Sequence, residues 1–206
     1  MNYYIDTEFI DHRKQQRLLG FGVGKSTWAT ELISIGIVDE EGREFYAVCN
    51  EFDLDAAWKD DWVRCHVLQR IHEDMCRLEP SYAKTYHYDL FEPFTKKSLQ
   101  YLLKRHGKTR YQVVQGIYAF IQENPVFYGY FADYDWVVFC HLFGRMIDLP
   151  SGFPMYCRDL KQLMDDLGLD EAWRKDNCPD SANEHHALAD ALWNMFLHRA
   201  IKQHKP

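Results

Sequence analysis

The sequence predicts an α/β fold, a mixed sheet covered by helices. Two observations lead to this fold class. Three runs of apolar, β-branched and aromatic residues, at 2–6, 31–39 and 43–49, fall within the first quarter of the chain. From residue 109 onwards, helical periodicity alternates with short apolar runs. A chain that opens with paired strands and continues as helix-strand-helix forms one sheet with helices packed against it.

The second and third runs give the clearest local signal, which is a β-hairpin. Glu41-Gly42 supplies a turn between two runs rich in β-branched and aromatic residues. Together with residues 2–6, they predict three antiparallel strands at the start of the fold. Residues 11–30 are polar at first and then rich in glycine, so we expect a long loop outside the core there.

The rest of the chain divides at about residue 108. Residues 58–107 mix aromatic side chains, prolines and scattered charges without a clear period, which predicts short helices and loops. Beyond them the elements are regular. In order, we expect a helix capped by Thr109 and ending near Asn124-Pro125, a strand at 126–131, a helix at 136–146, a short strand at 153–157, a helix ended by Gly168 and a last helix at 186–201.

Size and charge limit the class of protein. A chain of 206 residues is long enough for one sizeable domain, and a domain of this size buries about 70% of its surface, so it needs no disulfide or metal to fold. We therefore predict a single domain over residues 1–206. With 31 acidic and 24 basic side chains the net charge is -7, which excludes a polybasic nucleic-acid-coating protein and a cationic membrane-surface module. A nuclease is not excluded, because bound metal ions reverse the local sign of the charge.

The N-terminus and the cysteines predict a cytoplasmic location. Residues 1–6 contain neither a basic nor an apolar signal region, and no stretch approaches about 18 uninterrupted apolar residues. The six cysteines are scattered without a CxxC pair, which is typical of buried, reduced thiols. We expect a soluble cytoplasmic protein that contacts no membrane.

Asp6 and Glu8 form the first candidate site. They close the first strand two residues apart, so both carboxylates lie on the same face of the sheet. Paired acids on a surface are common and by themselves carry little information. Here the pair ends an apolar strand at the expected centre of the sheet, a position that suits a metal ion.

A second acidic site follows the buried strand at 126–131. Asp133 and Asp135 lie where this strand meets the next helix, the crevice in which open α/β sheets place their ligands. Either carboxylate could face inward. We favour Asp133 as the N-cap of the helix and Asp135 as the residue that takes part in chemistry.

The third site is Glu184-His185-His186, followed by Asp190. On a continuous helix, five positions correspond to about 500° of rotation, so His185 and Asp190 would not share a face. We place His185 in the loop before the helix, where it can reach over a site toward which Asp190 points. A single histidine is more often a surface or capping residue than a catalyst, so this assignment depends on the other two sites.

Together these residues predict a site for phosphodiester hydrolysis. Four carboxylates, Asp6, Glu8, Asp135 and Asp190, can hold two divalent cations about 4 Å apart, which clamp the attacking and leaving oxygens of an in-line displacement. Hard oxygen ligands favour Mg²⁺ or Mn²⁺ over zinc. The four negative charges balance two divalent cations, so the loaded site has no net charge and can bind a polyanion. His185, with an ordinary pKa of about 6.5, can deprotonate the attacking water near neutral pH.

The order of these motifs resembles that of the DEDDh 3′-5′ exonucleases, which have an RNase H-like (DnaQ-like) fold with a mixed five-stranded sheet flanked by helices. A narrower resemblance is to the mycobacterial-type 3′-5′ exoribonuclease branch, and it covers most of residues 1–70 and 108–200. It rests on the segments YIDTEFI (4–10), ELISIG (31–36), EGREFYAV (41–48), WVRCHVL (62–68) and YD (134–135).

The resemblance implies roles for the site residues. Asp6, Glu8, Asp135 and Asp190 would bind the two cations, and His185 would be the general base. It also implies release of nucleoside 5′-monophosphates from the 3′ end of a nucleic acid, with RNA as the favoured substrate, often by a homodimer. Residues 11–30 and 72–107 look longer than the family pattern, and we expect these insertions to shape the substrate entrance.

Phe9, Trp62 and His66 are the candidate substrate contacts. Trp62 and His66 lie one turn apart if their segment is helical, and they could then stack on the terminal base. Core packing is the favoured interpretation of Trp62, and for His66 the sequence favours neither role. Basic side chains between 96 and 110 could follow a nucleic-acid backbone, and a solvated polar face explains them equally well.

Two other functions are compatible with the same residues. One keeps the chemistry and changes the substrate, as in a DNA exonuclease or an oligonucleotide phosphodiesterase. The other is a non-catalytic nucleic-acid-binding module of the same fold. We rank this module last, because every acid that the chemistry needs is present.

Overall fold

A computed structural model describes residues 1–18, 21–79, 94–181 and 183–204. In this part of the chain, five strands form one mixed sheet in the order β3-β2-β1-β4-β5. The first three strands are antiparallel, and β4 and β5 continue the sheet in parallel with β1. The predicted fold class, a mixed five-stranded sheet flanked by helices, is confirmed. The strands are β1 (Asn2–Leu18), β2 (Phe21–Asp39), β3 (Glu44–Val48), β4 (Val126–Gly129) and β5 (Arg158–Asp159).

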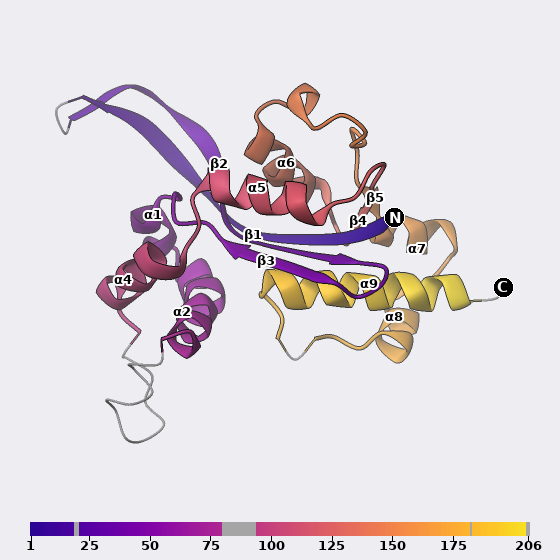
Figure 1. Ribbon diagram of the computed structural model, residues 1–206. Helices are drawn as coiled ribbons and strands as arrows, with labels where there is room; N and C mark the ends of the chain where they lie inside the picture. The colour runs from indigo at the N-terminus through magenta and orange to yellow at the C-terminus, as the bar shows by residue number, and fades with distance from the viewer. Residues whose placement is uncertain (19–20, 80–93, 182, 205–206) are drawn as a thin grey trace.

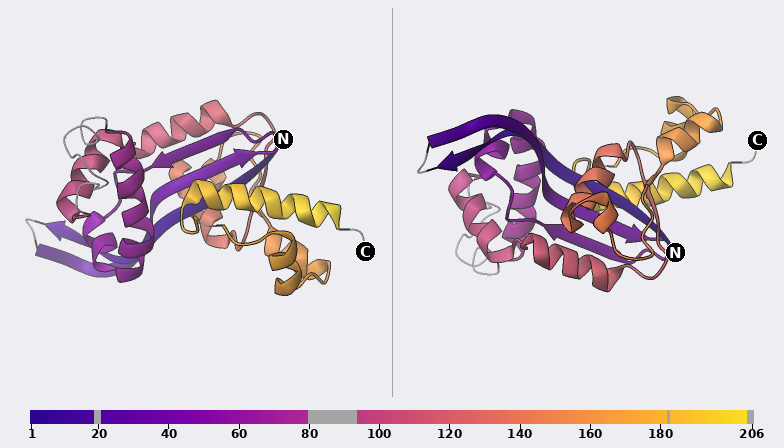
Figure 2. Two further views of the ribbon diagram at one scale, coloured as in Figure 1. Left: turned by 90° about the horizontal axis from the view of Figure 1, so that it is seen from below. Right: turned by 90° about the horizontal axis from the view of Figure 1, so that it is seen from above.

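Helices cover both faces of the sheet (Figures 1 and 2). The helices α5 (Arg110–Phe120) and α6 (Asp133–Phe143) lie on one face, and α9 (Ala187–Gln203) crosses the other. A third group packs where β1 and β2 project from the sheet (Figure 1). It consists of α1 (Leu54–Lys59), the π-helix η1 (Val63–Leu68), α2 (Gln69–Arg77) and α4 (Lys96–His106). The other described helices are the short 3₁₀ helix η2 (Met146–Asp148), α7 (Leu160–Asp166) and α8 (Glu171–Asn177).

The alternation of side chains along β1 separates two cores. Tyr3 and Ile5 are fully buried against α5 and α6. Tyr4, between them, packs on the opposite face with α7 and α9. Because strand side chains alternate, Asp6 and Glu8 continue the series of Tyr4 and face α9.

β1 and β2 extend beyond the sheet as a two-stranded arm (Figure 1). Their pairing continues from Ile10↔Glu31 to Leu18↔Phe21, so the loop predicted for residues 11–30 is wrong wherever that segment is described; residues 19–20 lie outside the description. The reason is that ladder hydrogen bonds need no apolar side chains, and the residues at 11, 13–14 and 25–28 are exposed, where polar side chains fit. The Thr30 hydroxyl also donates a hydrogen bond to Asp11 across the strands.

Several element boundaries differ from the prediction. α6 begins at Asp133 rather than 136, the last strand lies at Arg158–Asp159 rather than at 153–157, and α8 has no predicted counterpart. The short helices expected in 58–107 are present in its described parts, while residues 80–93 lie outside the description. Thr109 caps α5 as predicted, because its side chain accepts a hydrogen bond from the backbone N–H of Gln112.

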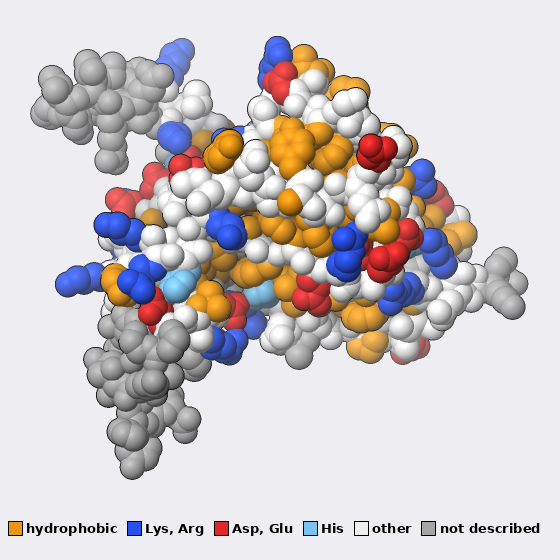
Figure 3. Space-filling view, viewed as in Figure 1, with side chains coloured by type: hydrophobic (Ala, Val, Ile, Leu, Met, Phe, Trp, Pro, Cys, Tyr) orange, Lys and Arg blue, Asp and Glu red, His pale blue; other side chains and the backbone are white. Residues whose placement is uncertain are grey.

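Charged side chains of both signs are interspersed on the face shown in Figure 3. In the predicted basic run, Lys96 pairs with Asp55, and both Arg105 and His106 pair with Glu79. These three side chains of the run therefore have acidic partners.

Most of the cysteines are buried, as expected. The six cysteines are free, but Cys65 is exposed and Cys157 is half-buried, so the expected burial is correct for the other four. No described helix has the length and apolar composition required to cross a bilayer.

Candidate active site

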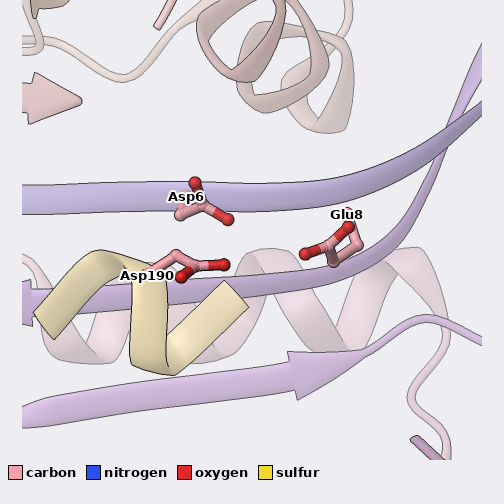
Figure 4. Close-up of side chains that lie close together, drawn as sticks. All are labelled: Asp6, Glu8 and Asp190. Atoms are coloured by element: carbon pink, nitrogen blue, oxygen red, sulfur yellow. The ribbon is translucent and has the colours of Figure 1, made fainter. Parts of the chain in front are cut away.

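Asp6 and Glu8 project from the middle of β1 toward the N-terminal turn of α9, which carries Asp190 (Figure 4). Across the ladder, Asp6 is paired with Gly36 and Glu8 with Ser34. Small partners on β2 leave room above the sheet for the helix and for the carboxylates. The ladder shifts register directly after Glu8, where Ile33 is the extra residue of a β-bulge. Bulges are common beside active sites because they re-aim the side chains next to them.

Gly36 determines where α9 begins. A Cβ atom at Gly36 would lie 2.2 Å from the carbonyl oxygen of Ala187, the first residue of the helix. The backbone of α9 therefore rests directly on the backbone of β2. This close approach brings Asp190, in the first turn, over Asp6.

The carboxylates of Asp6, Glu8 and Asp190 form a tight cluster, in which one oxygen of each lies within 4.8 Å of the other two. Burial raises the pKa of Asp6 well above its usual range, and repulsion from Asp135, Glu8 and Asp190 raises it further. Burial and the charges of Asp190 and Asp135 raise the pKa of Glu8 to about 8. Burial also raises the pKa of Asp190 to about 6. Bringing these groups together in the ionised state is unfavourable unless a cation joins them.

Asp135 lies beside this cluster but is held by Thr7. Its Oδ1 atom accepts hydrogen bonds from the backbone N–H of Thr7 at 2.8 Å and from the Thr7 hydroxyl at 2.5 Å. The pairing of β1 with β4 stops at Tyr4. Beyond that point the Thr7 N–H donates to the Asp135 carboxylate instead of to a neighbouring strand. Burial raises the pKa of Asp135 to about 6 despite these hydrogen bonds.

The neighbouring prediction for Asp133 is wrong. The N-cap of α6 is Ala132, and Asp133 is the exposed first residue of the helix. The backbone N–H of Ala132 is instead taken by the carboxylate of Asp159, at 2.7 Å. A partner from β5 has thus replaced the local cap that the sequence suggested.

His185 lies in the loop before α9, as predicted. Its backbone is left-handed, with φ of 64°, and its N–H donates a hydrogen bond to Asp190 Oδ2 at 2.8 Å. This conformation is uncommon for a residue other than glycine. Burial, with His66 and Arg70 nearby, lowers the pKa of His185 and favours its neutral imidazole.

The rings of Trp62 and His66 lie against His185. They stack on each other with centroids 5.2 Å apart, and each meets the His185 ring edge-on, at 4.8 and 5.8 Å. Trp62 is 49% exposed, so the core role favoured by the sequence is wrong. The π-helix that follows Trp62 brings the two rings together, and such helices are often found at functional sites. The Nδ1–H of His66 donates to the Trp62 carbonyl oxygen at 2.9 Å.

Phe9, the third predicted substrate contact, lies elsewhere. Its ring stacks on that of Tyr134 in α6, with centroids 5.6 Å apart and an angle of 8° between the planes. It packs on the α5 and α6 side of the sheet. The structure therefore brings Trp62 and His66 together with His185 and separates Phe9 from them.

Comparison with known proteins gives the family. The sequence profile of the 3′-5′ exoribonuclease Rv2179c-like domain matches residues 94–202. Two relatives from Mycobacterium tuberculosis are each 30% identical to this chain over 201 residues, which are 98% of this chain and 93% of the relative. Their names are 3′-5′ exoribonuclease Rv2179c, from strain H37Rv, and 3′-5′ exoribonuclease MT2234.1, from strain CDC 1551. The chain belongs to the Rv2179c-like 3′-5′ exoribonuclease family. The resemblance to the mycobacterial-type branch is confirmed.

Three features that position the site of this family member are missing from the sequence-based prediction. Thr7 holds Asp135, and Gly36 admits α9. His186 caps α9 through Nδ1, which accepts from the Ala189 N–H at 3.4 Å, while its Nε2 is 2.8 Å from Asp74 Oδ2 on α2. Both Thr7 and Gly36 lie inside the segments that carry the resemblance, but their contacts join residues far apart in the sequence.

The donor set fits a hard divalent cation. Asp6, Glu8 and Asp190 offer only carboxylate oxygens, which Mg²⁺ and Mn²⁺ prefer. Burial is the main cause of the raised pKa values of Glu8 and Asp190, and the nearby Arg70 offsets only part of the effect on Glu8. Asp135 could complete the set through Oδ2, because its Oδ1 is bound to Thr7.

Proposed function

We propose that the protein is a metal-dependent 3′-to-5′ exoribonuclease that releases nucleoside 5′-monophosphates with the help of two divalent cations, Mg²⁺ or Mn²⁺. One observation carries the proposal: Asp6, Glu8 and Asp190 converge within 4.8 Å, although they come from opposite ends of the chain. Family membership supports it, because both relatives carry the name 3′-5′ exoribonuclease.

In this proposal, Asp6, Glu8, Asp135 and Asp190 hold the cations. When bound, the cations would neutralise the carboxylates and stabilise the negative charge that develops during hydrolysis. His185 accepts the proton of the attacking water, because its ring lines the same cavity as Asp6 and Asp190. The hydrogen bond from its N–H to Asp190 keeps the histidine over the cluster.

Trp62 and His66 would receive the 3′-terminal nucleoside. They present a stacked, solvent-exposed aromatic pair in contact with His185, and so beside the position where the reacting phosphate would bind. Base stacking tolerates any sequence, which suits an enzyme that removes successive nucleotides.

The test is a time course with Mg²⁺ or Mn²⁺ on 5′-labelled RNA and DNA strands, with products separated at single-nucleotide length. We expect a ladder of shortened RNA and release of mononucleotides. Equal rates on DNA would remove the RNA preference, and metal-independent binding without cleavage would favour the non-catalytic module.

Variants assign the residues. Asp6→Ala and Asp190→Ala should abolish turnover and leave the fold intact, and mononucleotide release that persists in both would reject the assignment. Asp135→Ala should also abolish it, whereas Asp133→Ala, a matched exposed carboxylate two residues away, should leave the rate unchanged. For His185→Ala we expect a fall in kcat of about 10²- to 10⁴-fold, the usual contribution of a general base.

Further parts of the proposal concern the whole protein. We propose a single exonuclease domain over residues 1–206, in which the insertions 11–30 and 72–107 shape the substrate entrance; residues 19–20 and 80–93 of these insertions lie outside the described residues. We also propose a cytoplasmic location. We further propose a homodimer, and sedimentation analysis of the purified protein would test this oligomeric state.

A further inference from the structure

A cavity of about 570 Å³ opens beside the carboxylate cluster. Asp6, His185 and Asp190 line one side of it, and the aromatic residues Tyr130, Phe131 and Trp193 line another. A volume of this size is typical of sites for small organic ligands. The roles proposed above account for the acidic side of the cavity but not for its aromatic side.

The aromatic side is a continuous row of rings. Tyr130 meets Phe131 edge-on with centroids 4.7 Å apart, and it meets Trp193 in the same way at 5.1 Å. Trp193 is fixed in place, because its indole N–H donates to the Pro179 carbonyl oxygen at 3.0 Å and the Arg174 guanidinium lies 5.3 Å from the centre of its ring. One end of the row is therefore held by contacts within the protein.

Phe131 is exposed and conformationally unusual. Its side chain is 65% exposed, and its backbone is left-handed, with φ of 53°. This conformation is unfavourable for a bulky side chain, and residues held in this way concentrate at binding and catalytic sites. Phe131 lies between β4 and α6, at the carboxyl end of a central strand, where α/β sheets bind their ligands.

The charges around the cavity favour a neutral group over a phosphate. Both basic side chains that line the cavity have acidic partners: Lys161 pairs with Asp165, and Arg174 pairs with Glu171 and Asp180. Asp6, Asp190 and Glu184 add further negative charge. A planar, uncharged base with hydrogen-bond donors fits such a surface, because stacking on aromatic rings requires no positive charge.

His185 lies between this row and the Trp62–His66 pair, since it contacts that pair and also lines the cavity. We propose that the cavity binds the second nucleoside of the substrate, on the 5′ side of the scissile phosphodiester, with its base stacked on Phe131. The inference rests on the proposed function and deepens it. The enzyme would thus hold the two nucleosides joined by the scissile phosphate on opposite sides of His185.

Two substrates distinguish the subsite at Phe131 from the one at Trp62 and His66. The methyl ester of uridine 5′-monophosphate has a nucleoside on one side of its phosphate and only a methyl group, with no ring to stack, on the other, whereas RNA has a nucleoside on both sides. Phe131→Asn removes the ring and keeps a residue that tolerates the left-handed backbone. We expect it to lower kcat/KM for RNA by about 10- to 100-fold, the loss typical of a stacking aromatic, and to change kcat/KM for the ester less than about 2-fold.

Controls separate this inference from the function on which it rests. Trp62→Ala should lower kcat/KM for both substrates. Tyr156→Asn, at an exposed tyrosine outside the cavity, should lower it for neither. Calorimetry in Ca²⁺ should show weaker binding of a phosphorothioate dinucleotide to Phe131→Asn and unchanged binding of uridine 5′-monophosphate. Equal losses on both substrates, or none on RNA, would overturn the subsite alone. A wild-type protein that hydrolyses neither substrate would overturn the proposed function, and the subsite with it.

Discussion

Gly36 and Ala187 touch through their backbones, because a Cβ atom at Gly36 would lie 2.2 Å from the Ala187 carbonyl oxygen. Gly36 is also the ladder partner of Asp6. The residue that admits the last helix is thus opposite one of the site carboxylates, and Asp190 follows in the first turn of that helix. One glycine sets the distance between the two ends of the candidate metal site.

We expect Gly36→Ala to push the start of α9 away from the sheet. Displacing reactive groups by about 1 Å can lower activity about 10²-fold, and overpacking costs about 1–3 kcal/mol of stability. Mononucleotide release and the denaturant midpoint would show both effects. Gly42→Asn is the control, because a Cβ at Gly42 meets nothing within 4 Å and asparagine tolerates its positive φ. A Gly36→Ala protein with wild-type kcat would contradict this account of α9.

The carboxylate cluster should destabilise the protein when no metal is present. Burial and the charges of Asp190 and Asp135 raise the pKa of Glu8 to about 8, so ionising Glu8 costs free energy. Glu8→Gln in a chelator at pH 8.5 should therefore raise the free energy of unfolding by about 1–3 kcal/mol. The same substitution should abolish turnover when Mg²⁺ is present. The control, Glu123→Gln at an exposed position, should change neither quantity. A destabilised Glu8→Gln protein would show that the charge of Glu8 is satisfied by the protein itself.

Much of the fold could be predicted from local patterns. The β-hairpin at 31–49 and the Thr109 cap are local signals, and the structure contains both. The arm could not be predicted in the same way, because residues 11–14 and 25–30 bury little apolar surface and gain their order from cross-strand pairing. α8 is a single short helix whose cap, Asp170, is an ordinary residue in any loop.

The site shows the same division. Asp6 and Glu8 could be assigned from strand periodicity, and His185 from its rotation relative to Asp190. The exposure of Trp62 could not be foreseen, because it depends on a π-helix and on contact with a residue more than 120 positions away. The cap at Ala132 likewise depends on Asp159, in a different strand. Residue type led to the proposed chemistry, whereas long-range packing decided the geometry.

Asp74 should act as a positioning residue through His186. It accepts from Nε2 of His186, whose Nδ1 then faces the Ala189 N–H at the start of α9. Asp74→Ala should leave the His186 ring held only by its stacking on Tyr46 and by its contact with Ala189. It should lower kcat about 10-fold with little change in KM, since Asp74 contacts no substrate. Arg77→Ala is the control, because Arg77 pairs with the other oxygen of Asp74 and is exposed. Partial recovery in Asp74→Asn would support positioning, while equal losses in Asp74→Ala and Arg77→Ala would indicate a role of the Asp74–Arg77 ion pair instead.

His198 supplies a separate, pH-dependent contribution to stability. It is 2% exposed on α9, with Nδ1 2.9 Å from the Tyr4 hydroxyl and its ring 4.1 Å from that of Tyr128. Burial, helped by the charges of Lys202 and Arg158, lowers the pKa of His198 to about 4. The folded protein therefore favours the neutral ring, whereas the unfolded chain protonates near its ordinary pKa of about 6.5.

Stability from His198 should be complete above pH 6.5 and should be lost as the pH falls toward 4, because the unfolded state then binds the proton more readily. By linkage the loss between pH 7.5 and 4.5 is about 2–3 kcal/mol. Urea unfolding of wild type and His198→Gln across this range measures it, since glutamine keeps a hydrogen-bond partner for Tyr4 but does not titrate. The variant starts from lower stability, and the difference between the two proteins should shrink as the pH falls. A difference that stays constant would mean that another group, such as the carboxylates around Asp6, accounts for the acid sensitivity.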